Sequence, residues 1–285
     1  MVSVSHNNKN SGRVGIIAGR GDLPLSLANN LKKQGQDPFL LLVKGEALPS
    51  DYTDFSHEII AITKVGKFLK ILKKEKCSRV TLAGPVARPD FKNILPDMEG
   101  LKLLAKISTS VSKGDDGLMR AISSYIEEKG FQLVGAHELN TEFLADAGPL
   151  GTILPNEDDL LDIKEGIRIT QAIGALDIGQ AVIIRNGYVL GVEAAEGTEK
   201  LIERCAEFAW EKPAGILVKL AKPEQDLRAD MPAVGPDTIL QIVSSGLRGL
   251  AIEADRCLIV RKDEVIRLAN EKGVFLYGVS TESQK

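Results

Sequence analysis

The sequence is poor in the residues on which several large classes of protein depend. It holds three cysteines (Cys77, Cys205 and Cys257), and their spacing matches neither a zinc site nor a redox motif. We therefore expect reduced, mostly buried thiols and a cytosolic setting. The three histidines are equally scattered, which gives little support to a histidine-based nucleophilic triad. His137 is followed by Glu-Leu rather than by the rest of an HExxH motif, so we interpret it as a satisfied polar group.

Long apolar runs and an excess of basic charge are also missing. No apolar stretch approaches the roughly 20 residues that span a bilayer. Residues 1–13 are polar and lack the apolar segment of a signal peptide, so any membrane contact is expected to be peripheral. The net charge of −3 argues against a nucleic-acid-binding protein. A hydrophobic content of 44% and a length of 285 residues instead suit two globular domains.

Hydrophobic periodicity predicts alternating strands and helices. An Asn186-Gly187 pair between two apolar runs predicts a β-hairpin with a type I′ turn. Strands are expected at 14–18, 39–43, 58–62, 79–83, 131–136, 180–185, 188–192, 215–220, 248–254, 256–260 and 274–279. Helices are expected at 25–33, 64–76, 101–107, 118–129, 158–174, 198–210, 237–243 and 263–272.

This pattern predicts an α/β protein of two domains. After a disordered tail at 1–12, a Rossmann-like domain with a parallel sheet is expected at 13–140. A stretch rich in glycine and proline at 141–158 has the composition of a linker. The remainder, 159–285, is expected to be a catalytic α/β domain with a mixed sheet.

Several stretches of the first domain are candidates for binding an anion. The turn Gly19-Arg-Gly-Asp-Leu-Pro24 joins a strand to a helix, where phosphates bind, but it equally fits a plain βα turn. Arg88 follows a strand end and either binds phosphate or pairs with Asp90. Asp116 near a helix start is interpreted first as a cap. The helix at 64–76 carries six lysines, which either rest on an anionic membrane surface or form a solvated face.

In the second domain, Glu193 and Glu196 lie between a strand and a helix that Thr198 could cap. Such a place suits a metal or a phosphate, although Glu near a helix start is also favourable electrostatics. Lys219 is unusual inside an apolar strand: it is at a sheet edge, extends to solvent, or points at an anion.

The loop at 222–236 holds the strongest candidates for chemistry. It follows a buried strand and precedes a helix, as working groups of α/β sheets often do. If the loop is extended, Asp226, Arg228 and Asp230 share one face and suit a divalent cation together with a phosphate oxygen. An extended loop would also place the two carboxylates about 13 Å apart. The loop therefore bends, or one Asp binds metal while the other orients water; ordinary solvated charges are the alternative.

Five ordered stretches resemble the LpxI-type UDP-2,3-diacylglucosamine pyrophosphatases of lipid A biosynthesis. They are Ile16–Pro24, Ala83–Pro89, Lys113–Arg120, Gly191–Thr198 and Lys222–Pro232. The resemblance implies an enzyme dependent on Mg²⁺, with Mn²⁺ as an alternative, that is cytoplasmic and peripheral to the inner membrane. It would hydrolyse UDP-2,3-diacylglucosamine, a lipid-linked nucleotide sugar, to UMP and 2,3-diacylglucosamine 1-phosphate (lipid X). The sequence leaves the oligomeric state open, and a homodimer is one arrangement it allows.

Carried over onto this sequence, the resemblance implies the following site. The catalytic residues are Asp226, Arg228 and Asp230, and the metal ligands are Asp226, Asp230 and Glu193. The substrate-binding residues are Gly19, Gly21, Leu23, Pro24, Gly84, Arg88, Asp116, Glu196, Gly197, Thr198, Lys219, Lys222 and Gln225. A non-catalytic nucleotide-sugar-binding or regulatory protein is the alternative, since it would need the glycine turn but not the carboxylates. A dinucleotide oxidoreductase is a third hypothesis. It would need an acidic residue after the second strand to hold the ribose, and Lys44 and Glu46 near that point neither support nor exclude it.

Overall fold

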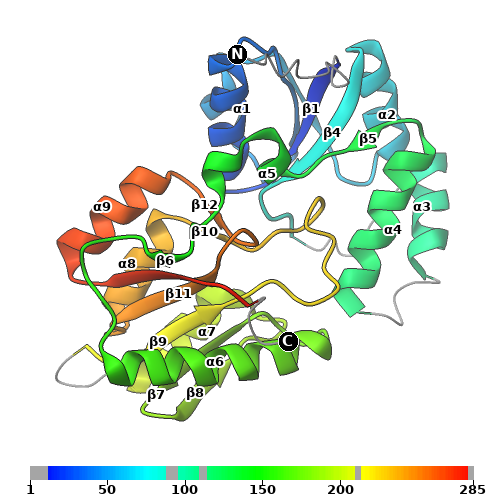
Figure 1. Ribbon diagram of the computed structural model, residues 1–285. Helices are drawn as coiled ribbons and strands as arrows, with labels where there is room; N and C mark the ends of the chain where they lie inside the picture. The colour runs from blue at the N-terminus through cyan, green and yellow to red at the C-terminus, as the bar shows by residue number, and fades with distance from the viewer. Residues whose placement is uncertain (1–11, 88–95, 109–113, 209–212, 282–285) are drawn as a thin grey trace, which may run out of the picture. The chain divides into compact units, whose positions relative to one another are not determined.

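A computed structural model describes residues 12–87, 96–108, 114–208 and 213–281. The described chain forms two compact units, one within Met1–Ser110 and Ala121–Val134, the other within Val111–Arg120 and Gly135–Lys285. Each has its own β-sheet (Figure 1). The two-domain α/β prediction is therefore confirmed. The predicted boundaries of the domains stay a prediction, and the tail at 1–12 lies outside the described residues except for Gly12.

The N-terminal unit is built on a five-stranded parallel sheet in the order β3-β2-β1-β4-β5. Helices α1 and α2 lie on opposite sides of this sheet (Figure 1), as right-handed crossovers require when the strand order reverses at β1. The elements are β1 (Arg13–Ala18), α1 (Leu23–Lys33), β2 (Phe39–Val43), η1 (Pro49–Tyr52), β3 (His57–Ile60), α2 (Val65–Lys74), β4 (Cys77–Ala83), α3 (Met98–Ser108), α4 (Gly114–Glu128) and β5 (Gln132–Leu133).

The C-terminal unit contains a mixed six-stranded sheet in the order β6-β13-β11-β9-β7-β8. Strands β9, β11 and β13 run parallel, whereas β7 is antiparallel to both neighbours and β6 is antiparallel to β13. The elements are α5 (Ala136–Leu139), η4 (Thr141–Phe143), β6 (Gly148–Pro149), α6 (Glu157–Ala175), β7 (Ala181–Arg185), β8 (Tyr188–Val192), α7 (Gly197–Cys205), η5 (Ala206–Phe208), β9 (Ile216–Lys219), β10 (Ala233–Val234), α8 (Pro236–Ser244), β11 (Gly249–Glu253), β12 (Leu258–Ile259), α9 (Lys262–Lys272) and β13 (Phe275–Val279).

Two apolar layers sandwich this second sheet. Along β7, Ala181 and Ile183 join the cluster formed with α7, α8 and α9, whereas Val182 and Ile184 join the cluster formed with α6. Successive side chains of a strand point to opposite faces, so the buried apolar run Ala181–Ile184 of β7 means that both faces are covered. The sheet is thus the middle of three layers, and its polar groups must lie at the strand ends.

The predicted β-hairpin turn is confirmed, because its two residues strongly favour one turn type. Asn186 and Gly187 have φ of 48° and 77°, as a type I′ turn requires, and Asp162 accepts hydrogen bonds from both of their N–H groups. The strand expected at 131–136 shrinks to Gln132–Leu133, because Gly135 starts helix α5. The strand at 256–260 is only Leu258–Ile259. The helix expected at 198–210 ends at Cys205, and Trp210 lies outside the described residues.

The predictions about the cysteines and about membrane-spanning segments can be compared with the structure. All three cysteines are buried as free thiols. Burial raises the pKa of Cys77 to about 11 and that of Cys257 to about 12. No helix in the described part of the chain is long and apolar enough to cross a membrane.

Candidate active site

In the N-terminal unit, two glycine-containing loops meet where β1 and β4 end. These adjacent strands flank the point at which the strand order reverses, the usual ligand position of such a sheet. Gly19 N donates to Ala83 O at 2.8 Å, and a Cβ on Gly19 would lie 2.4 Å from Pro85 O. A Cβ on Gly84 would lie 2.3 Å from the carbonyl oxygen of residue 20. Only glycine allows the two loops to approach this closely, whatever they bind.

The rest of the glycine turn lies beside this contact. Gly21 has a φ of 82°, and nothing lies within 4 Å of where its Cβ would be. Pro24 is buried early in α1, directly after Leu23. Arg20 pairs with Glu46 at 2.9 Å, so its charge is balanced within the unit. The structure therefore gathers the predicted ligand residues of this unit, except Arg88, which lies outside the described residues.

In the C-terminal unit, a buried lysine stands at the carboxyl end of the central strand β9. Lys219 pairs through its backbone with β7 on one side and β11 on the other, and it is 7% exposed. It is therefore neither at a sheet edge nor extended to solvent, so two of the three interpretations of this lysine are wrong. Its Nζ donates to Thr198 Oγ1 at 3.0 Å and to the carbonyl oxygen of Ala233 at 3.4 Å. Across the residues that the structure describes, it forms no ion pair.

Thr198 links this ammonium to a buried carboxylate. The Thr198 hydroxyl donates to Glu193 Oε1 at 2.8 Å, and Glu193 Oε2 accepts from Gln180 N. The prediction that Thr198 caps helix α7 is wrong, because the helix starts at Gly197 and Glu196 occupies the capping position. Glu196 instead pairs with Arg204 at 3.1 Å. Thr198 therefore lies in the first turn of α7, where the helix dipole is positive.

A second cluster surrounds Lys222, three residues further along the chain. Lys222 Nζ lies 2.9 Å from Asp116 Oδ1 and 2.5 Å from Asp177 Oδ1, and both Lys222 and Asp116 are buried. Burial alone would lower the pKa of this ammonium, but its hydrogen bonds to Asp177 and Asp116 outweigh burial and raise the pKa. Two carboxylates thus hold Lys222, and a phosphate would have to compete with both.

The Lys222 cluster leads to a prediction about stability. Lys222→Met leaves two carboxylates facing each other without a cation, so we expect a loss of about 3–5 kcal/mol at neutral pH. Because the lysine pKa is raised, its contribution is complete below the ordinary value of 10.5 and disappears as the pH rises through the folded-state pKa. Urea unfolding at several pH values measures this. Lys200→Met removes an exposed pair with Glu203 and should leave the stability almost unchanged; equal losses in both variants would contradict the prediction.

The loop that follows is bent, which is one of the two alternatives left open above, so its three charges do not share one extended face. The N–H groups of Ala229 and Asp230 both donate to Asp226 O, which closes a single helical turn. Arg228 donates to both carboxylate oxygens of Asp226, from Nε at 3.0 Å and from Nη2 at 2.9 Å. Asp230 Oδ2 accepts from Gln225 Nε2 at 2.7 Å. Backbone hydrogen bonds within the turn favour the bend over the alternating geometry of a strand.

The described carboxylates do not assemble a metal site by themselves. No group of three or more His, Cys, Asp or Glu side chains is placed to hold an ion in the described residues. The three predicted ligands already accept hydrogen bonds, Asp226 from Arg228, Asp230 from Gln225 and Glu193 from Thr198. As arranged here, they fit hydrogen-bond donors rather than a cage of protein ligands around a cation.

Two residues that hold the start of the candidate loop, Glu253 and Asp177, were missed by the sequence analysis. Glu253 closes β11, and its Oε2 accepts from Ala221 N at 2.8 Å while its Oε1 accepts from Thr281 Oγ1. Glu253 thereby fixes the start of the candidate loop. A glutamate at the end of an otherwise apolar strand was the available signal. Asp177, with a φ of 53° after a helix, gave no signal beyond that of a turn.

His137 is a further correction. Its Nδ1 is buried without a hydrogen-bond partner among the described residues, so the expectation of a satisfied polar group is wrong. Burial lowers its pKa, which keeps the ring neutral near pH 7. A Cβ at Gly135 would lie 2.4 Å from His137 Cε1 and 3.2 Å from Arg228 Cα, so glycine is needed for the ring and the loop to pack here.

Models of one protein family match both units of the chain. Residues 13–143 match the model of the LpxI N-terminal domain, and residues 146–277 match that of the LpxI C-terminal domain. The chain belongs to the LpxI family, which confirms the predicted resemblance. A protein of Caulobacter vibrioides named UDP-2,3-diacylglucosamine pyrophosphatase LpxI is 36% identical over 278 residues, which cover 95% of this chain and 99% of the relative.

Proposed function

We propose that this protein hydrolyses the diphosphate of UDP-2,3-diacylglucosamine and releases UMP and 2,3-diacylglucosamine 1-phosphate. The observation that carries the proposal is Lys219, a buried ammonium without an ion-pair partner in the described structure, hydrogen-bonded to the first turn of α7. Ammonium and helix start both favour an anion at the carboxyl end of the sheet. Near full-length similarity to a pyrophosphatase of that name supports the choice of substrate.

The reaction consumes one water. Water attacks one phosphorus, the bridging P–O bond breaks, and the bridging oxygen leaves with the other phosphate. Positive groups must offset the negative charge of the diphosphate as the bond breaks. Lys219 and Arg228 supply that charge in this proposal, and Asp226 orients the attacking water and takes its proton.

The ion pair between Asp226 and Arg228 indicates the order in which the two side chains would act. Arg228 is 38% exposed in its side chain and Asp226 is 16% exposed, so an incoming phosphate reaches the guanidinium first. A phosphate that takes Arg228 as its partner releases the Asp226 carboxylate for water. We propose that substrate binding thereby activates the carboxylate, whereas without substrate the pair stays closed.

We also propose that hydrolysis requires Mg²⁺, with Mn²⁺ as a substitute. The cation would arrive on the diphosphate, because Mg²⁺ is commonly held by substrate phosphates and only one or two protein carboxylates. Asp226, Asp230 and Glu193 are the carboxylates that could complete its shell, and it would stabilise the developing charge. This arrangement agrees with the lack of a ready cage in the described residues.

Chelation tests the cation directly. Purified protein, extensively dialysed against EDTA, should release UMP at a small fraction of the rate measured with added Mg²⁺, and Mn²⁺ should restore part of the rate. Calcium serves as a control, since it binds phosphates with a looser geometry. Equal UMP release with and without chelator would remove the cation from the mechanism but leave the hydrolase assignment intact.

Further proposals concern the setting of the reaction. An amphiphile with two acyl chains and a nucleotide head is met at a membrane surface, so we propose a cytoplasmic enzyme peripheral to the inner membrane. A homodimer stays a prediction, since one chain is described. If no UMP is released under any condition while UDP-diacylglucosamine still binds, the alternative of a nucleotide-sugar-binding or regulatory protein takes the place of the hydrolase.

A further inference from the structure

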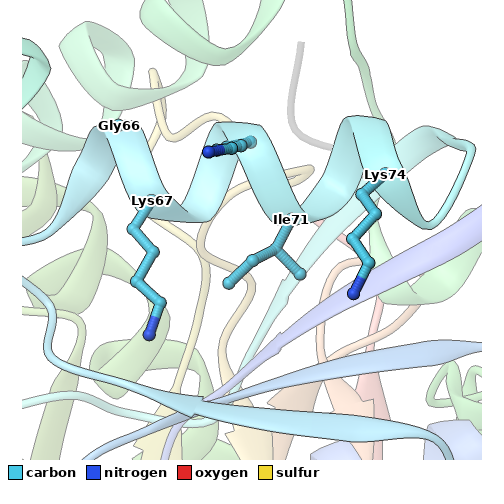
Figure 2. Close-up of a pocket in the computed structure, with 5 residues that line it drawn as sticks. Gly66, Lys67, Ile71 and Lys74 are labelled. Atoms are coloured by element: carbon cyan, nitrogen blue, oxygen red, sulfur yellow. The ribbon is translucent and has the colours of Figure 1, made fainter.

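Helix α2 of the N-terminal unit presents a concentration of positive charge that the proposed chemistry does not use. Residues 64–76 contain six lysines and one acid, Glu75, in a protein whose net charge is −3. Lys67, Lys70 and Lys74 line a hollow of about 620 Å³ together with Gly66 and Ile71. Figure 2 shows Lys67, Ile71 and Lys74 projecting from the same side of the helix. We name this surface the α2 lysine face.

Two acids close to this face, Glu75 and Asp97, are already engaged. Glu75 pairs with Arg13 at 2.7 Å, and Lys74 reaches it only at 3.8 Å. Asp97 accepts from the backbone N–H groups of Gly66 and Lys67, so it caps the start of α2. Within the described ranges, Lys67 and Lys70 form no ion pair. The positive charge of this face therefore stays exposed. In a helix that only faces water, pairing these lysines with acidic side chains would add stability.

Apolar groups adjoin the charge. Ile71 lines the hollow but is itself buried, whereas α3, which packs beside α2, exposes Met98 by 71% and Leu101 by 50%. Ammonium groups on flexible stems above apolar surface suit the headgroup layer of a bilayer, where the charge meets lipid phosphates and the stems lie among acyl chains. A soluble phosphate would need converging donors in a polar cleft, whereas these lysines follow one another along a single helix.

We propose that the α2 lysine face docks the protein on an anionic phospholipid bilayer. The inference rests on the proposed function only in its choice of partner, because the substrate carries two acyl chains. Docking by this face holds the enzyme at the surface in which those chains are embedded. Each lysine near an anionic membrane contributes roughly a five-fold factor in affinity, so three contribute about 100-fold together.

Vesicle flotation tests the proposal. The protein should float with vesicles of phosphatidylglycerol and phosphatidylcholine in equal parts at low ionic strength, and much less with pure phosphatidylcholine. Lys67→Gln, Lys70→Gln and Lys74→Gln combined should weaken binding to the mixed vesicles about 100-fold. Glutamine is a good helix former, so α2 should persist, which circular dichroism and thermal unfolding check.

A matched control separates a specific face from overall charge. Lys33, Lys164 and Lys272 are exposed lysines in other helices, and their combined replacement by Gln changes the net charge equally. This control should bind mixed vesicles as the unaltered protein does. Equal weakening by both triple variants, or no weakening by the α2 variant, would overturn the proposal. Displacement from vesicles by inorganic diphosphate at constant ionic strength would also overturn it, by identifying a site for a soluble phosphate.

Measurements of UMP release separate membrane docking from catalysis. With substrate dispersed in detergent, the α2 triple variant should release UMP at the rate of the unaltered protein, because no bilayer has to be found. A loss of detergent-phase activity together with vesicle binding would overturn docking as the role of this face. If neither protein releases UMP, the proposed function has failed, while the flotation result still decides whether the face binds bilayers.

Discussion

Asp226→Asn should lower the turnover number roughly 10²–10⁴-fold while KM stays within a few-fold of the original value. The amide is nearly isosteric with the carboxylate but accepts no proton from water. The guanidinium of Arg228, which donates to this carboxylate, is unaltered in the variant, so its proposed contact with the substrate phosphate should persist. UMP release as a function of substrate concentration separates the two kinetic constants.

The control for this variant lies in the same loop. Glu224→Gln makes the same chemical change at a side chain that is 85% exposed and lies 3.7 Å from Arg120. It should retain nearly full turnover. A large rise in KM with unchanged turnover in Asp226→Asn would assign Asp226 to binding alone. Unchanged kinetics would place the water-orienting carboxylate elsewhere.

Lys219→Met should reduce kcat/KM at least about 100-fold, the usual consequence of losing one positioned charge donor in a site. The methionine fills the same buried space, and Thr198 keeps its hydrogen bond to Glu193, so the fold should persist. Steady-state kinetics and a thermal unfolding curve on the same preparation measure the two effects separately.

A double variant distinguishes phosphate binding from simple charge balance. If Lys219 serves only to balance the buried Glu193, then Lys219→Met with Glu193→Gln restores a neutral pair and should restore activity. If Lys219 binds the diphosphate, the double variant stays far less active than Glu193→Gln alone, which is measured beside it because Glu193 is also a candidate metal ligand. Recovery of activity in the double variant would therefore remove Lys219 from the substrate site and leave the proposal without its main support.

The sequence was sufficient for the architecture because strand and helix periodicities are local. Apolar runs such as Phe39–Val43 and Ala181–Ile184 lie in buried strands, and Asn186-Gly187 is the expected turn. Short pairings were harder, because β5 and β12 are two residues each and depend on neighbours distant in the sequence. Their ends are decided by Gly135 and by tertiary contacts rather than by propensity.

The residues of the candidate site were named from the sequence, but the hydrogen bonds between them were not predicted. Lys219, Thr198 and Glu193 were each singled out, yet their hydrogen-bonded chain joins three separate elements and no local pattern encodes it. The same holds for Lys222, whose partners Asp116 and Asp177 are 106 and 45 residues away. The closed pair of Asp226 and Arg228 depends on a turn that charge spacing alone did not reveal.

Because its three thiols are buried, the protein is suited to site-specific labelling with a spectroscopic probe. Burial raises the pKa of the Cys257 thiol to about 12, so little of the reactive thiolate is present at pH 7. Cys77, with a pKa of about 11, and the buried Cys205 are shielded from maleimides in the same way. A cysteine introduced on an exposed helix face can therefore carry a fluorophore while the native sulfur atoms stay in place.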